Sequence, residues 1–145
     1  MILDYKYVAG LFDGEGWFEL NRSSGKRWRM KREYAYFCRA GLQIREKYII
    51  ESLQETFGGK IYTSKPKSDK HSVTYKWNVF GNQAVCFADK VAPFLLAKKQ
   101  QAEILVQFQA QKKENGNKAL SDERYALYGE LHEKMKILNK RGVGK

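Results

Sequence analysis

The sequence predicts an α+β domain with the element order αββαββα, one four-stranded antiparallel sheet and additional helices at the C-terminal end. Two observations lead to this prediction. An apolar stretch with helical spacing, followed by a pair of alternating segments, occurs twice, at about residues 4–45 and 47–81. The rest of the chain has helical spacing, and no linker interrupts the 145 residues, so we expect a single domain over residues 1–145.

The first unit begins with a helix expected over about residues 4–14, because Asp4 is a good N-cap and Gly14 and Gly16 favour a helix end. The segments WFELNRSS and EYAYFCRAGLQIRE follow as the two strands of a hairpin. In the second strand, apolar residues alternate with Arg39 and Gln43, which predicts one apolar and one polar face.

The second unit begins with KYIIESLQETFGG, whose apolar spacing predicts a helix that ends at the glycines. GKIYTSK and SVTYKWNVFG follow as a second hairpin and complete a sheet over about residues 16–81. Helices are expected over about residues 82–140, with an interruption at Pro93 and a cap signal at Ser121.

The charge of the chain favours a polyanionic partner. Lys and Arg number 27 against 16 Asp and Glu, a formal net charge of +11, and nucleic acid is the commonest such partner. The polar face of the predicted sheet carries side-chain types that contact base edges, and both hairpin loops are basic. The alternative is a solvated face without a partner. The residues predicted to bind DNA are Asn21, Ser23, Lys26, Arg27, Arg29, Arg39, Gln43, Lys60, Tyr62, Lys65, Lys67, Thr74, Lys76 and Asn78.

Other features limit the location and the metal chemistry. No apolar run approaches membrane-spanning length and the N-terminus lacks a signal-peptide layout, so we expect no membrane partner and an intracellular protein, cytoplasmic or organellar depending on the host. Cys38 and Cys86 are isolated in apolar surroundings and are expected to be reduced core residues. His71 and His132 are isolated too, so no histidine-based metal cluster is expected.

Two acids stand at the expected end of the first helix, in YVAGLFDGEGWFEL, where the helix dipole disfavours negative charge. Gly10 and Gly14 form a small-residue stripe that permits close approach of another helix. If two copies pair through this helix, both Glu15 carboxylates meet, and a Mg²⁺ ion between them removes the repulsion. The alternative is packing against the chain's own core. The predicted dimer interface is Ala9, Gly10, Asp13 and Gly14.

The same residues carry a family resemblance. VAGLFDGEG, residues 8–16, is similar to the nine-residue motif of the LAGLIDADG homing endonucleases, and FGGKIY and APFLLAKKQQA extend the resemblance to about residue 110. A single motif in a chain of this length resembles the homodimeric branch. The resemblance implies a saddle-shaped sheet and double-strand cleavage of a long, nearly palindromic DNA target. It also implies Mg²⁺ as cofactor, with Mn²⁺ substituting and Ca²⁺ binding without supporting cleavage.

The resemblance also assigns roles to residues. It implies Glu15 as metal ligand with the main-chain carbonyl of Gly14 beside it, Glu46 as the residue that orients active-site water, and Lys98 near the water and the phosphate. The neighbouring Lys99 is the alternative to Lys98 if the match slips by one residue.

Some positions are left open by the resemblance. Asp13 corresponds to the more structural acid of the motif. A second basic residue expected just after the second strand is not evident, and Lys47 is the alternative. Two other functions stay open for this fold: an RNA maturase that assists intron splicing, and a DNA-binding regulator that does not cut.

Overall fold

The computed structural model describes residues 1–28, 31–65 and 72–140. The predicted DNA contacts Arg29 and Lys67 lie outside the described residues. The helices are α1 (Tyr5–Glu15), α2 (Lys47–Phe57), α3 (Gly81–Val91), α4 (Lys99–Asn115) and α5 (Asp122–Leu138). The strands are β1 (Gly16–Ser24), β2 (Tyr34–Ile44), β3 (Lys60–Ser64) and β4 (Thr74–Phe80). Short 3-10 turns are η1 (Gly25–Trp28) and η2 (Ala92–Phe94).

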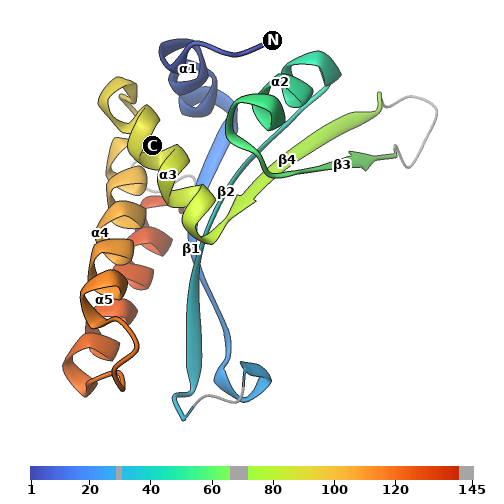
Figure 1. The fold of residues 1–145 in the computed structure, drawn as a ribbon. Coiled ribbons are helices and arrows are strands. Elements are labelled where there is room, and N and C mark those ends of the chain that lie inside the picture. Colours follow the sequence, from blue (N-terminus) through green and yellow to red (C-terminus); the bar gives the residue numbers. More distant parts are fainter. Residues whose placement is uncertain (29–30, 66–71, 141–145) are drawn as a thin grey trace.

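The predicted αββαββα order is confirmed. The four strands form one antiparallel sheet in the order β1-β2-β4-β3, so the second strands of the two hairpins pair with each other in the middle. Figure 1 shows the two hairpins diverging, which curves the sheet into a saddle, with the described helices gathered on one side of it. The polar residues were predicted to lie on the opposite face of the sheet, away from the helices.

Helix α1 begins where the sequence predicts and ends later. The Asp4 carboxylate accepts a hydrogen bond from the backbone N–H of Lys6 at 2.7 Å, which confirms the N-cap. The helix continues through Gly14 to Glu15, and Gly16 then opens β1 with an ordinary φ of −88°. Gly16 does not serve a left-handed turn: a Cβ there would run into the ring of Phe12.

The core lies between the helices and the inner face of the sheet. Its centre is a group of aromatic rings, in which Phe12 of α1 lies 4.7 Å from Phe87 of α3 between ring centroids. Trp77 of β4 is fully buried against the same rings, and its indole N–H donates to the carbonyl of Gly58 at 2.7 Å. Because α1, α3 and the sheet share these rings, the position of α1 relative to the sheet is fixed by packing.

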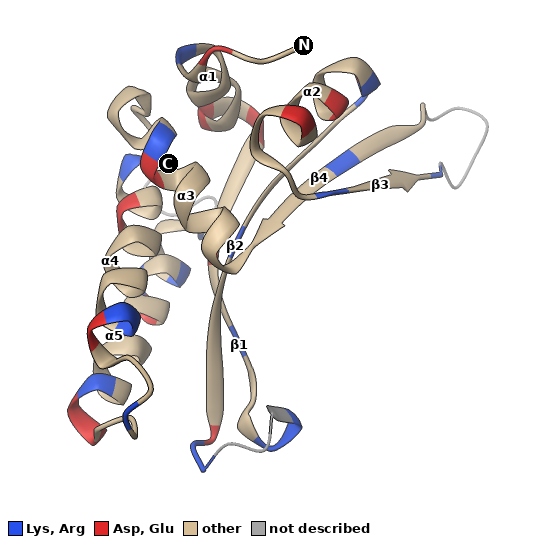
Figure 2. Cartoon of the chain, in the orientation of Figure 1, with Lys and Arg blue, Asp and Glu red and all other residues tan. Residues whose placement is uncertain are grey.

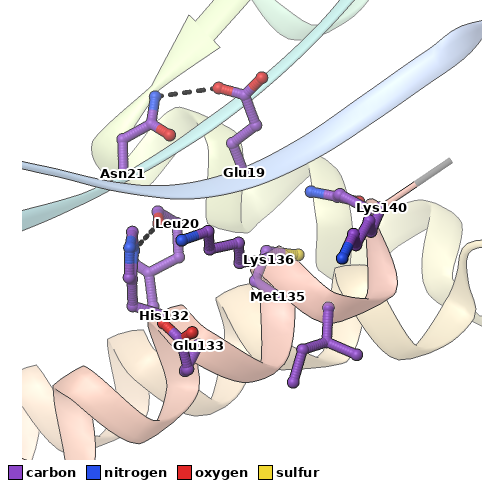
Figure 3. A pocket seen from close by; sticks show the side chains of 10 residues that line it. Glu19, Leu20, Asn21, His132, Glu133, Met135, Lys136 and Lys140 are labelled. Atoms are coloured by element: carbon purple, nitrogen blue, oxygen red, sulfur yellow. Dashed lines mark hydrogen bonds between the residues drawn. The ribbon is translucent and has the colours of Figure 1, made fainter.

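The outer edge of β1 is closed by side chains from α5. The Nδ1–H of His132 donates to the carbonyl of Leu20 at 2.7 Å, and the amide of Asn139 donates to the carbonyl of Phe18 at 2.8 Å. Figure 3 shows the first of these bonds, beside a cavity of about 610 Å³ between β1 and α5. Edge strands otherwise offer unpaired backbone groups to other chains, so α5 protects this edge of the sheet.

The two cysteines lie in different environments. Cys38 is buried under α4, and burial raises the pKa of its thiol to about 12. Cys86 is exposed on α3, so the prediction that it is a core residue is wrong. None of the described helices combines the length and the apolarity needed to span a bilayer.

We therefore predict that the native protein has one thiol that reacts with a soluble disulfide reagent at pH 8. Cys86→Ser should abolish this reaction, because the buried Cys38 stays protonated and shielded until the protein unfolds. Thiol counting before and after denaturation measures it. Two thiols that react equally fast with the reagent in the native protein would contradict the burial of Cys38.

Candidate nucleic-acid interface and metal site

The polar residues of the four strands share one face. Strand register puts Gly41 between Trp17 of β1 and Asn78 of β4, and Asn78 in turn opposite Lys60 of β3. A second row runs from Gln43 through Lys76 to Tyr62. Directly opposed residues of antiparallel strands project to the same side. The strand register therefore places these side chains together on the open face, as predicted.

Most predicted DNA contacts on this face and at its ends have solvent access. Those at least partly exposed are Asn21, Ser23, Lys26, Arg27, Arg39, Gln43, Lys60, Tyr62, Lys65, Thr74 and Lys76. Figure 2 shows Lys and Arg on β3 and β4 and mostly Lys and Arg at the end of the β1–β2 hairpin, whereas α1 and α2 carry both signs of charge. The open face and the hairpin end are thus the cationic surfaces that a polyanion would meet.

Asn78 departs from the prediction. It lies on the expected face but is only 4% exposed. A Cβ at Gly41 would collide with Asn78 Oδ1 and with the ring of Trp17, so these two side chains close over the glycine. The structure does not offer Asn78 to a ligand on the solvent side, and its prediction as a direct contact is corrected.

At the end of α1, Asp13 holds the segment that leads into α4. Its carboxylate accepts hydrogen bonds from the backbone N–H groups of Leu96 at 2.8 Å, Ala97 at 3.1 Å and Lys98 at 3.0 Å. A carboxylate that accepts several backbone N–H bonds is committed to that role. Asp13 therefore connects α1 to the segment after η2, as the more structural acid of the motif should.

Lys98 completes this connection in the other direction. Its ammonium donates to the carbonyls of Phe12 at 2.9 Å and Asp13 at 3.2 Å, in the last turn of α1. Helix α1 has no basic residue of its own in that turn. A cation at a helix C-terminus offsets the dipole that disfavours acids there. We call this reciprocal pair of contacts between Asp13 and Lys98 the α1 clamp.

Glu15 and Glu46 line one cavity of about 720 Å³. Gln43 and Thr74 of the open sheet face line it as well, and the Gln43 amide donates to the Thr74 hydroxyl at 2.7 Å. The structure thus brings the predicted metal ligand together with the predicted water-orienting residue, at the end of the cationic face. Lys98 does not line this cavity, and its ammonium lies on the α1 carbonyls instead.

The donor set at this cavity suits a hard divalent cation. Carboxylate and carbonyl oxygens are the ligands that Mg²⁺ takes, and Glu15 and Glu46 are both exposed. Within the described parts of the chain, no group of three or more His, Cys, Asp or Glu side chains could hold a metal. One chain therefore supplies two acids, and further ligands would come from a backbone carbonyl, water or a second chain.

The exposed side of α1 is open at its glycines. A Cβ at Gly10 or at Gly14 would meet nothing within 4 Å, so neither glycine is needed for packing inside the chain. Ala9 is fully buried in the chain's own core, and the prediction that it lies at a dimer interface is wrong. Asp13 faces the segment after η2, as described above, and its carboxylate is not available to a partner.

The sequence profile of the LAGLIDADG endonuclease family matches residues 8–101, from the glycine-rich end of α1 to the start of α4. The chain belongs to the LAGLIDADG endonuclease family. The match covers the elements that build the cavity and the open sheet face. Comparison with curated protein sequences gave no match.

Solved structures share the LAGLIDADG fold. The homing endonuclease I-CvuI in complex with the I-CreI target has a TM-score of 0.74 and 16% identity, over 97% of this chain and 84% of that one. The archaeal intron-encoded homing endonuclease I-Vdi141I complexed with DNA has a TM-score of 0.75 and 17% identity, over 97% and 87%. The LAGLIDADG homing endonuclease I-LtrWI bound to target DNA has a TM-score of 0.67 and 18% identity, over 91% of this chain and 44% of that one.

Sequence reasoning missed residues on the open face of the LAGLIDADG sheet. Trp17 and Glu19 belong to it, because they alternate with the buried Phe18 and Leu20 of β1. The same alternation was visible in the sequence and could have placed them. Lys47, the alternative basic residue, lies over the ring of Tyr75 at 5.7 Å and does not line the cavity.

The α1 clamp makes a prediction about stability. Lys98→Ala should lower the free energy of unfolding by about 1–2 kcal/mol, because two carbonyls at a helix end lose a charged donor. Lys99→Ala is the matched control, since Lys99 is exposed and begins α4 one residue later, and it should change stability by less than about 0.5 kcal/mol. Urea titration of both variants measures the difference, and equal losses would contradict the clamp.

Proposed function

We propose that the protein is a homing endonuclease that cuts both strands of a specific, nearly palindromic DNA site with the help of a divalent cation. The observation that carries this proposal is the shared cavity, in which Glu15 and Glu46 adjoin Gln43 and Thr74 of the cationic sheet face. A DNA backbone that lies on this face would pass the two carboxylates. The complexes of I-CvuI and I-Vdi141I with DNA support DNA as the ligand.

In this proposal Glu15 is the metal ligand, with the carbonyl of Gly14 beside it, and Glu46 orients water. A bound Mg²⁺ ion would supply a hydroxide-forming water and charge stabilisation at the leaving oxygen. The I-CvuI complexes were determined with 2 mM Mg and with 2 mM Ca, which supports a divalent cation here. Mn²⁺ should substitute for Mg²⁺, and Ca²⁺ should support binding without cleavage.

Lys98 acts on the reaction through α1 in this proposal. Its ammonium holds the carbonyls of Phe12 and Asp13, three and two residues before Glu15, so that the helix end keeps one position. Its positive charge at the end of α1 offsets the partial negative charge of the helix terminus beside Glu15. The cationic side chains of the open face, such as Lys76, position the DNA and carry its affinity.

We propose that the active species is a homodimer formed through the exposed side of α1. Each chain offers one Glu15, and cutting two strands requires two such sites. The I-LtrWI chain, of which this chain covers 44%, has room for a second unit of this size, and a second copy would supply it here. Gly10 and Gly14, with open space around them, permit the close approach of two helices.

Glu15→Gln should abolish cleavage in Mg²⁺ and leave DNA binding within about tenfold, or roughly 1.4 kcal/mol. The amide keeps the size of the side chain but is a poorer ligand for a hard cation. Glu130→Gln is the control, because Glu130 is exposed on α5 away from the cavity. The cut sites are first selected from a random DNA library with Mg²⁺, and cleavage and binding are then measured on one of them.

If Glu15→Gln cuts as fast as wild type, Glu15 is not the metal ligand. If the wild type binds specific sites but cuts none of them, the protein is a DNA-binding regulator and not an endonuclease. Specific binding to a folded intron RNA, without DNA cleavage, would favour the maturase.

Gly10→Leu should give a folded protein that no longer dimerises and no longer makes double-strand breaks. Gly10 is exposed and a Cβ there meets nothing within 4 Å, so the monomer should keep its fold, but the added side chain would separate the two helices and the two Glu15 carboxylates. Ala110→Leu, on the exposed surface of α4, is the matched control and should change neither property. Sedimentation with and without target DNA, beside a cleavage assay, tests this, and a monomer that cuts both strands would refute it.

A further inference from the structure

The open sheet face carries one acidic side chain among the described strand residues. Glu19 lies in the middle of β1, directly opposite Arg39 of β2. Its carboxylate oxygen lies 3.1 Å from Nη2 of Arg39, and the amide of Asn21 donates to the same oxygen at 2.9 Å. Figure 3 shows the bond between Asn21 and Glu19 above the strand.

A negative charge at this place needs a reason, because the face is otherwise cationic and would meet phosphate. Like charges repel, so Glu19 lowers the affinity of the face for any DNA, whatever its sequence. Charges that cost affinity are retained where they add discrimination between partners. Glu19 is therefore a candidate for a role in specificity.

The pair is partly buried, with the Arg39 side chain 28% and the Glu19 side chain 29% exposed. Three buried side-chain polar atoms without a hydrogen-bond partner are Arg39 Nε, Trp17 Nε1 and Asn78 Oδ1. All three belong to this face, and Trp17 and Asn78 cover Gly41, the next residue of β2 on the same side as Arg39. An ion pair that is partly shielded from water is stronger than one on an open surface. The Arg39 side chain is thus held in one place.

On the basis of the DNA-cutting function proposed above, we propose that Arg39 reads one guanine in each half of the target and that Glu19 is the positioning residue that orients it. A guanidinium has five N–H donors in a plane. Glu19 engages Nη2 and Nε is buried, so the donors left for a base lie on the two terminal nitrogens. A guanidinium edge matches guanine O6 and N7 in the major groove, and its fixed plane is what makes that match selective.

The alternative to this role is a direct contact between Glu19 and a base. A carboxylate can itself accept from cytosine N4, and Glu19 would then act without Arg39. In the proposal Glu19 acts only through Arg39, so removing Arg39 leaves Glu19 with nothing to orient. A double variant distinguishes the two cases.

The experiment sequences the sites that wild type, Glu19→Gln, Arg39→Ala and the double variant cut from a random library with Mg²⁺, with Glu130→Gln as a charge-matched control. Binding to the same library in Ca²⁺ gives the affinities. Wild type should require guanine at one position in each half-site, and Glu19→Gln should weaken that preference about tenfold while other positions keep theirs. The double variant should match Arg39→Ala alone. Thermal unfolding checks that each variant is folded.

Uniformly tighter binding of Glu19→Gln to all sequences, with no change at a single position, would overturn the proposal and leave Glu19 as a charge that only repels phosphate. A loss of preference in Glu19→Gln that differs in position from that in Arg39→Ala would assign Glu19 a base contact of its own, which also overturns it. Failure of the wild type to select any site would instead refute the proposed endonuclease function, so the two failures are distinguishable.

Discussion

The rest of the structure depends on how the C-terminal end of α1 is held. This end carries acids where the helix dipole disfavours them, and it must also hold Glu15 at one place beside the sheet. The α1 clamp meets both demands: Asp13 binds three backbone N–H groups of the segment before α4, and Lys98 returns a cation to the α1 carbonyls. The aromatic core then fixes the clamped helix against β1, so the cavity keeps its shape.

The open face of the sheet combines two requirements that oppose each other. It exposes polar side chains to solvent, yet the middle of a sheet tolerates few unpaired polar groups. At Gly41 the absent side chain leaves room for Trp17 and Asn78, whose Nε1 and Oδ1 atoms are buried there without a hydrogen-bond partner. The exposed polar residues, such as Gln43 and Lys76, then stand around a closed centre. Position on the face and access to a ligand are therefore separate properties.

Much of the fold was predictable because it depends on local periods and caps. Asp4 and Ser121 mark helix starts that the structure confirms, and strand alternation placed the polar face correctly. The site was less predictable, since its parts meet only in three dimensions. The sequence could indicate that Ala9 is small but not that it is fully buried, and it could indicate Lys98 but not the carbonyls that it binds. The alternation of β1 could have placed Glu19 on the open face. Glu19 was missed because the prediction did not use the pattern of charges along this strand.

The closed edge of β1 has a consequence for the order in which parts of the protein unfold. The carbonyls of Phe18 and Leu20 are satisfied by Asn139, directly after α5, and by His132 of α5. Detachment of α5 alone would leave the sheet intact with a bare row of acceptors along one side. Such a partly unfolded species is a template for strand addition by its neighbours. On this basis we expect the tendency of the protein to aggregate to follow the local stability of α5 more closely than the global free energy of unfolding.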